Sequence, residues 1–155
     1  MRKDIKGYEG LYQIDEDGHV YSLNYNGTRK IKNLKTVKNR RGYYVVGLFK
    51  DKKLKTHYLH RLVAEAFVEN LENKPQVDHY DGDRSNNHVS NLRWVTNQQN
   101  QWNRRTAKGC CFNKAKGKWQ AYIHVDGKYI HLGLFDTEEA ARAAYLEAKE
   151  IYHII

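Results

Sequence analysis

Short alternating runs of apolar and polar residues, joined in pairs by tight turns, recur along this chain of 155 residues. One pair surrounds Asp17-Gly18, a second turns at residues 51–53, and a third turns at Asp126-Gly127. A period of two residues is typical of strands with one buried face, and Asp-Gly favours a hairpin turn. The second and third pairs lead into helical patterns at residues 59–70 and from about Thr137. The sequence therefore predicts an α+β fold of small antiparallel hairpins and helices.

The same local plan repeats without repetition of sequence, which favours small modules along an extended ligand over one large core. We expect four segments: an N-terminal module at 1–28, a basic connector and hairpin at 29–56, a central unit at 57–106, and a C-terminal module at 107–155. The C-terminal module is expected to be a three-stranded antiparallel sheet packed on one helix.

Charge narrows the class of partner, because the formal net charge is +9. Neutralising phosphates releases counterions and gives affinity that needs no recognition of sequence. Nucleic acid is therefore the favoured partner, and a basic protein without such a ligand is the alternative. Residues 29–41 are rich in Lys and Arg and end in Arg40 and Arg41. They form either a solvated connector or a segment that contacts phosphates, and we favour phosphate contact.

The sequence disfavours membrane insertion, secretion and a small-molecule cofactor. No apolar run approaches the roughly 18 residues of a membrane span, and the N-terminus lacks the apolar region of a signal peptide. We expect a cytoplasmic protein with no membrane partner and no small-molecule cofactor. The two cysteines, Cys110 and Cys111, are adjacent, so they offer neither a disulfide framework nor the spacing of a structural zinc site. We interpret them as strand residues.

The segment from Val77 to Asn100 concentrates polar side chains. Residues 76–80 predict a strand, residues 81–83 a turn, residues 93–95 a second strand, and residues 97–105 a helix that Thr96 can cap. If Asp78 and His79 end the first strand, Asp78 and Asn100 can converge on one cation, with His79 alongside. Oxygen ligands favour a hard cation, so Mg²⁺ or Mn²⁺ is expected, one per site.

Such a site suits hydrolysis of a phosphodiester bond. A histidine can take a proton from water at neutral pH, and a metal can stabilise the charge that develops on phosphate oxygens. We therefore predict that His79 is the general base. Asn91, at the return of the loop, can bond the backbone near His79 and brace the site. His60 could contact phosphate, although a structural hydrogen bond is favoured for it.

The sequence VDHYDGDRSNNHVSNLRWVTNQQN, with HRLVAEAF upstream, resembles the ββα-metal motif of HNH endonucleases, and most of all the phage and intron-encoded homing branch. The resemblance covers about residues 57–105. It implies that His79 is the general base, Asp78 and Asn100 are metal ligands, and Asn91 is the central asparagine. Asn100 stands where the HNH consensus has a histidine, as is common in the homing branch, which argues for a weakly held divalent ion.

Both flanks resemble partners of the same branch. GYEGLYQIDEDGHVYSL is similar to a short module that often precedes these nuclease domains, although the tryptophan frequently found before it is missing. From Gly109 onward the chain resembles the APETALA-type DNA-binding domain of plant ethylene-response factors, whose three-stranded sheet reads the major groove. The resemblance therefore implies double-stranded DNA as the partner.

Alternation selects the DNA-facing side of the C-terminal sheet. Trp119, Ala121, Ile123 and Val125 share one strand face, which we expect to pack on the helix with Ile130 and Leu132. The other face would contact DNA, and arginines near the central unit would contact phosphate. These candidates are Lys118, Gln120, Tyr122, His124, Tyr129 and His131 on the sheet, and Arg93, Arg104 and Arg105 near the central unit.

Two functions from different classes fit these patterns. One is a metal-dependent, site-specific DNA endonuclease that nicks one strand as a monomer. We expect a monomer because the sequence has no heptad repeat or apolar stripe that indicates a dimer interface. The other is a DNA-binding regulator that keeps the HNH scaffold without cleavage. The presence of Asp78, His79 and Asn100 together favours the endonuclease. Cleavage of RNA is disfavoured, because a major-groove reader does not suit the deep, narrow groove of an RNA helix.

Overall fold

The structure is a computed structural model that describes residues 1–102 and 108–153. The chain forms two compact units, residues 1–100 and residues 101–155, and each is described by itself. Arg104 and Arg105, which we predicted to contact DNA, lie outside the described residues.

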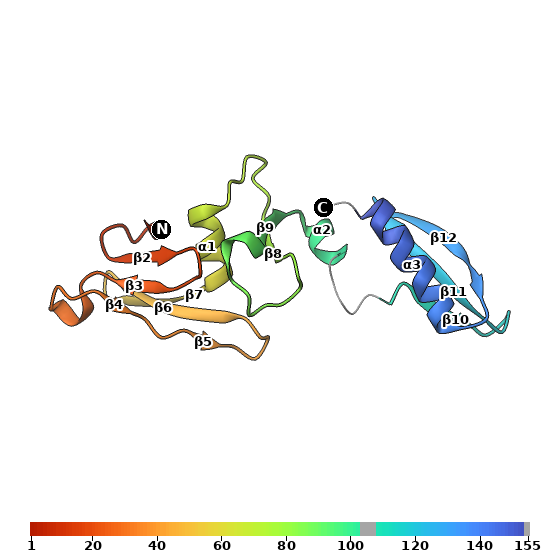
Figure 1. The fold of residues 1–155 in the computed structure, drawn as a ribbon, viewed down its shortest axis with the longest axis horizontal. Coiled ribbons are helices and arrows are strands. Elements are labelled where there is room, and N and C mark those ends of the chain that lie inside the picture. Colours follow the sequence, from red (N-terminus) through yellow and green to blue (C-terminus); the bar gives the residue numbers. More distant parts are fainter. Residues whose placement is uncertain (103–107, 154–155) are drawn as a thin grey trace. The chain divides into compact units, whose positions relative to one another are not determined.

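The first unit opens with two small antiparallel sheets (Figure 1). The first sheet has the order β1-β2-β3-β4, and the second has the order β5-β6-β7. Their bounds are β1 Arg2–Asp4, β2 Tyr12–Asp15, β3 Val20–Ser22, β4 Lys32–Asn33, β5 Val37–Lys38, β6 Tyr44–Lys50 and β7 Lys53–Tyr58, with a 3₁₀ turn η1 at Tyr25–Gly27. The basic connector therefore contributes an edge strand to each sheet.

Both hairpins predicted in this unit form. The β2–β3 hairpin turns at residues 16–19, with Gly18 at φ +85°. The β6–β7 hairpin turns at Asp51 and Lys52 alone, since Lys53 already pairs with Lys50. Asp51 and Lys52 both have positive φ. This is the backbone conformation that a two-residue hairpin turn requires at both central positions if it is to match the right-handed twist of the strands.

The central unit follows as helix, strand, loop, strand and helix. The elements are α1 Leu59–Phe67, β8 Gln76–His79, the 3₁₀ turn η2 Val89–Asn91, β9 Leu92–Val95 and α2 Asn97–Trp102. Helix α1 ends three residues before the predicted Asn70, because Val68 is already extended and the Asn70 side chain bonds both polar backbone atoms of Lys74. These bonds close the loop that leads back to β8.

One core serves the whole first unit. Its buried residues come from both sheets, from α1 and from the β8–β9 hairpin: Ile5, Tyr8, Ile14, Val20, Val46, Leu48, Leu59, Leu62, Val63, Ala64, Val77 and Leu92. The two sheets, α1 and the β8–β9 hairpin therefore share this core within residues 1–100. Hairpins this small bury too little apolar surface alone, so they pack on a shared helix.

The second unit has the predicted three-stranded antiparallel sheet packed on a helix, in the order β10-β11-β12. Its elements are β10 Cys110–Asn113, β11 Lys118–Val125, β12 Lys128–Phe135 and α3 Glu138–Tyr152. The Thr137 hydroxyl accepts a hydrogen bond from the Ala140 amide, as its predicted role as an N-cap requires. Gly109 has φ +63° and lies so close to the Tyr145 ring that a Cβ could not fit.

The alternation of β11 is confirmed. Ala121 and Ile123 are fully buried against α3, and Trp119 and Val125 pack around them. Lys118 and His124 are exposed, as are Tyr129 and His131 on β12. Among the described residues, the structure has no helix long and apolar enough to cross a membrane.

Candidate active site

The β8–β9 hairpin ends at the polar cluster predicted from the sequence. Asp78 lies opposite Arg93 and His79 lies opposite Leu92, so the two polar residues occupy the last ladder positions of β8. Asp78, His79 and Asn91 are all buried. Buried polar groups are costly unless they are bonded, so their partners indicate how the site is organised.

The imidazole of His79 is oriented by Asn87. Its Nε2 lies 3.2 Å from Asn87 Oδ1, and the Asn87 amide nitrogen donates to the Ser85 carbonyl at 3.2 Å. Because the amide nitrogen is engaged with Ser85, the carbonyl oxygen faces the imidazole and can only accept. In the neutral ring, Nε2 therefore carries the hydrogen and Nδ1 carries the lone pair. In this tautomer, Nδ1 is the ring nitrogen that could accept a proton.

Asn91 braces the loop between the two strands. Its side-chain oxygen accepts from the Asp81 amide at 3.1 Å, and its backbone oxygen accepts from the Tyr80 amide at 2.8 Å. The Asn91 amide nitrogen donates to Asp81 Oδ1 and to the Asn86 carbonyl. These bonds hold the residues just after His79, but the ring itself is oriented by Asn87.

Asp78 accepts two hydrogen bonds from Arg93 on the facing strand, at 3.0 and 3.2 Å, both at Oδ2. The pair is partly buried, and Arg93 also lies over the Tyr80 ring. Arg93, predicted to contact phosphate, therefore has a protein partner in this structure. A divalent cation at Asp78 would therefore compete with Arg93 for this carboxylate.

Asn100 lies on α2, directly after β9. Thr96 begins this helix with reciprocal bonds: its hydroxyl accepts from the Gln99 amide, and the Gln99 side chain accepts from the Thr96 amide. The Asn100 amide donates to the Thr96 carbonyl, so Asn100 is in the first turn and half-buried. A carboxylate and an amide oxygen are ligands that suit Mg²⁺ or Mn²⁺. The donor set at Asp78 and Asn100 therefore fits such an ion.

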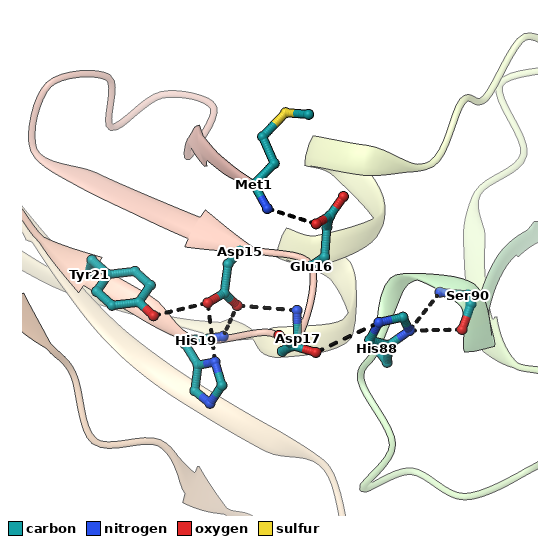
Figure 2. Close-up of polar contacts among 8 residues, drawn as sticks. All are labelled: Met1, Asp15, Glu16, Asp17, His19, Tyr21, His88 and Ser90. Atoms are coloured by element: carbon teal, nitrogen blue, oxygen red, sulfur yellow. Dashed lines mark hydrogen bonds and ion pairs between the residues drawn. The ribbon is translucent and has the colours of Figure 1, made fainter.

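The loop of the site is anchored to the β2–β3 turn, as Figure 2 shows. The Val89 amide donates to the Glu16 carbonyl at 2.9 Å, and His88 Nε2 lies 3.7 Å from an Asp17 carboxylate oxygen. A Cβ added at Gly18 would lie 3.2 Å from the Leu59 side chain and in ordinary contact, at 3.5 Å, with the Asn87 Cβ. The N-terminal sheet therefore supports the residue that orients His79.

Asp15, Asp17 and His19 also group potential metal ligands in this turn. The Asp15 carboxylate accepts from the Asp17 and His19 amides and from the Tyr21 hydroxyl, and it pairs with the His19 ring (Figure 2). Burial raises the pKa of Asp15, but bonds from the His19 amide and the Tyr21 hydroxyl outweigh it and leave the pKa below its usual value. We therefore interpret this group as the stabilising bonds of the turn.

Acid should weaken this turn. A carboxyl with a lowered pKa stabilises the fold above its unfolded-state pKa of about 4, and this stability is lost as pH falls through the folded-state value. We expect the melting temperature to fall steeply below about pH 4. Asp15→Asn should melt earlier at pH 6 and show a shallower fall in acid. Thermal unfolding followed by circular dichroism from pH 6 to pH 2.5 tests this, and identical pH profiles for both proteins would contradict it.

The predicted DNA-contacting residues occupy two surfaces. Arg40 and Arg41 are exposed in the β5–β6 turn, beside the loop of the site, because Arg84 donates to the Arg41 carbonyl and Lys38 donates to Ser85. The remaining described candidates share one face of the C-terminal sheet: Lys118, Gln120, Tyr122, His124, Tyr129 and His131. On that face Gln120 bonds the Tyr129 hydroxyl, and the Tyr122 and Tyr129 rings stack.

Sequence reasoning missed Asn87, whose side chain orients His79. The signal was weak, because an asparagine in a polar loop turns the backbone far more often than it orients a histidine. The residues between His79 and Asn87 form neither a helix nor a strand, so side-chain period gives no relation between the two. Only the path of the loop brings the two side chains together.

Comparison with known proteins agrees with this geometry. A model described as HNH endonuclease matches residues 57–102, and one described as the NUMOD4 motif matches residues 2–49. The DNA endonuclease I-HmuI of Bacillus phage SP01 is 49% identical over 110 residues, which are 67% of this chain and 59% of that protein. A putative HNH homing endonuclease, YosQ, from the SPbeta prophage of Bacillus subtilis is 36% identical over 101 residues, 64% of this chain and 54% of YosQ.

A solved structure extends the likeness to nearly the whole chain. It concerns DNA binding and cleavage by the HNH homing endonuclease I-HmuI, with a TM-score of 0.62 and 34% identity. The match covers 98% of this chain and 91% of that one. The N-terminal match also reaches residue 49, well past the boundary expected at residue 28. The buried Asp-His pair, the bracing asparagine and these relatives show that the chain belongs to the HNH endonuclease family, with homing endonucleases related to I-HmuI.

Proposed function

We propose that this protein is a metal-dependent, site-specific DNA endonuclease of the homing type, which hydrolyses one phosphodiester bond of duplex DNA as a monomer. The observation that carries the proposal is the orientation of His79. Its neutral ring is fixed by Asn87 with the lone pair at Nδ1, beside a carboxylate that can hold a cation. A base that must take a proton from water needs this preparation.

In this proposal each residue of the site has a separate role. His79 Nδ1 would accept the proton of the attacking water, and Asn87 would hold the ring while it does so. Asp78 and Asn100 would hold one Mg²⁺ or Mn²⁺. When bound, that ion would supply positive charge for the phosphate and leaving oxygens. Arg93, released from Asp78, could then contact the phosphate, because a guanidinium binds phosphate and carboxylate oxygens in the same geometry.

Two surfaces would bind the DNA. Arg40 and Arg41 project from the turn that contacts the loop of the site, so we propose that they contact phosphates near the scissile bond. We also propose that the C-terminal module is an APETALA-type domain that reads base edges with the exposed face of its sheet. The amide, phenol and imidazole groups on that face can bond bases, whereas Lys118 would contact phosphate.

A supercoiled-plasmid nicking assay tests the activity. A plasmid library carrying random inserts is incubated with the full chain and either Mg²⁺ or a chelator, and nicked products are sequenced at their new ends. We expect nicks only with the metal and at a shared sequence. Absence of metal-dependent nicking across the library would contradict the proposal.

The Asp78–Arg93 ion pair is the observation that favours the alternative, a DNA-binding regulator without cleavage, because it occupies the predicted metal ligand. Calorimetric titration with Mn²⁺ separates the two functions. Binding of one ion by the wild type, lost in Asp78→Asn, supports the endonuclease. DNA binding with no ion bound at millimolar Mn²⁺ supports the regulator.

The sheet face gives a prediction for affinity. Gln120→Ala combined with Tyr129→Ala should weaken binding to the selected site by about 30-fold or more, because each base-contacting group is worth about 1 to 3 kcal/mol in the best geometry. Binding to random DNA should change little, since phosphate contacts remain. Leu146→Ala, exposed on α3 away from this face, is the control. Fluorescence anisotropy measures both affinities, and equal losses on both DNAs would contradict base reading.

A further inference from the structure

Helix α1 places a second histidine against the general base. The rings of His60 and His79 have centroids 5.1 Å apart and planes inclined at 55°. His60 is only 7% exposed, although it is the second residue of a helix whose N-cap, Tyr58, lies at the surface. The proposed function above leaves this buried histidine without a role.

The Nδ1 atom of His60 fits neither role first considered for this residue. Among the described residues, its Nδ1 has no hydrogen-bond partner, so that nitrogen makes no structural bond. The same atom is buried, so it cannot contact a phosphate at the surface. Burial, with smaller contributions from His79 and Arg61, lowers the pKa of His60 to about 3. The ring is therefore neutral at any pH at which the enzyme would act, and it does not compete for the proton.

The remaining contribution of His60 is the packing of its ring against neighbouring rings. Tyr43 lies beside both histidines, with its centroid 5.0 Å from His60 and 6.1 Å from His79. Arg84 covers Tyr43 at 4.8 Å, and Tyr58 closes the cluster at 5.5 Å from His60. His79 is thus bonded by Asn87 at Nε2 and packed by two further rings. Packed rings restrict the rotation of an imidazole in addition to any hydrogen bond that it makes.

We propose that His60 is a positioning residue for His79: with Tyr43 it forms a wall of rings that keeps Nδ1 of the base directed at the attacking water. This inference rests on the proposed nuclease function, which it deepens. The two rings of the wall come from α1 and from the β5–β6 turn, so both elements would influence the orientation of the His79 ring. A loosely held base loses rate because small displacements of reacting groups are costly.

Packing alone predicts how the variants should differ. His60→Ala removes the wall, so kcat should fall by about tenfold while KM for DNA stays within about twofold. His60→Phe keeps a ring and removes the unpartnered nitrogen. It should therefore retain kcat within about threefold and melt at the same or a higher temperature. His57→Ala is the matched control, because His57 is half-buried on β7 and bonds Tyr8 instead of the site.

The readouts are single-turnover nicking, thermal unfolding and the ¹⁵N chemical shifts of the His79 ring. In the wild type and His60→Phe, these shifts should report the hydrogen on Nε2. In His60→Ala they should report a mixture of the two tautomers. If His60→Ala does not fold, Tyr43→Ala opens the same wall from the β5–β6 turn and should give the same mixture.

The outcomes separate this inference from the proposed function. No nicking by the wild type would refute the function, yet the His79 shifts would still test the wall. Folded His60→Ala with wild-type kcat and an unchanged tautomer would overturn the positioning role. A loss in His60→Phe as large as that in His60→Ala would also overturn it, since it would show that the nitrogen and not the ring matters.

Discussion

Replacing His79 by alanine is expected to slow DNA nicking by about 10²- to 10⁴-fold, the usual contribution of a positioned general base. The variant removes the Nδ1 lone pair that Asn87 prepares. DNA affinity should change little, because the imidazole is buried and the residues proposed to bind DNA are exposed side chains elsewhere. Single-turnover nicking of a plasmid that carries the selected site measures the rate, and fluorescence anisotropy measures the affinity.

Two controls separate loss of the base from loss of the fold. His19→Ala removes an exposed histidine of the β2–β3 turn and should nick at close to the wild-type rate. Added imidazole should restore part of the rate of His79→Ala, since the deleted ring leaves space at the end of β8. A folded His79→Ala that nicks as fast as the wild type would refute the assignment.

The conservative change Asp78→Asn should lower the nicking rate at 1 mM Mg²⁺ by about 10²- to 10³-fold, which corresponds to the several kcal/mol that a metal supplies to a charged transition state. The amide keeps an oxygen for Arg93, so the fold should persist, but it lacks the charge that holds a hard cation. Raising Mg²⁺ should recover part of the rate. The rate as a function of metal concentration is the measurement.

Asp51→Asn is the matched control for this change. Asp51 is exposed at the β6–β7 turn, where its φ of +52° is a backbone that asparagine also adopts readily. This variant should follow the wild-type dependence on Mg²⁺. An Asp78→Asn protein with that same dependence would show that the ion is held elsewhere.

Much of the local structure could be predicted because it depends on neighbours in sequence. The alternation of β11, the Thr137 cap and the strand pair that carries Asp78 and His79 follow from side-chain period and turn chemistry. The end of α1 could not, because it depends on how Asn70 bonds Lys74 after the chain has turned. Helix ends are weakly encoded when no glycine or proline marks them.

The shared core of residues 1–100 could not be predicted from the sequence. Alternation of apolar and polar residues identifies the apolar face of each hairpin. It does not indicate which other element of the chain will pack on that face. In the structure α1 lies between these hairpins and the β8–β9 pair, so one helix buries several small surfaces together (Figure 1). This packing also brings the β2–β3 turn onto the loop of the site.

The sequence by itself determined the small hairpins and helices and the family motif. It also placed Asp78, His79, Asn91 and Asn100 as the candidates for chemistry. These features are local, because strand period, turn residues and motif spacing all act within a few tens of residues. Only the tertiary structure decided that Asn87 orients the base, that Arg93 pairs with Asp78, and that His60 and Tyr43 enclose His79. Those contacts join residues whose separation in sequence carries no periodic signal, so they exist only once the shared core has packed.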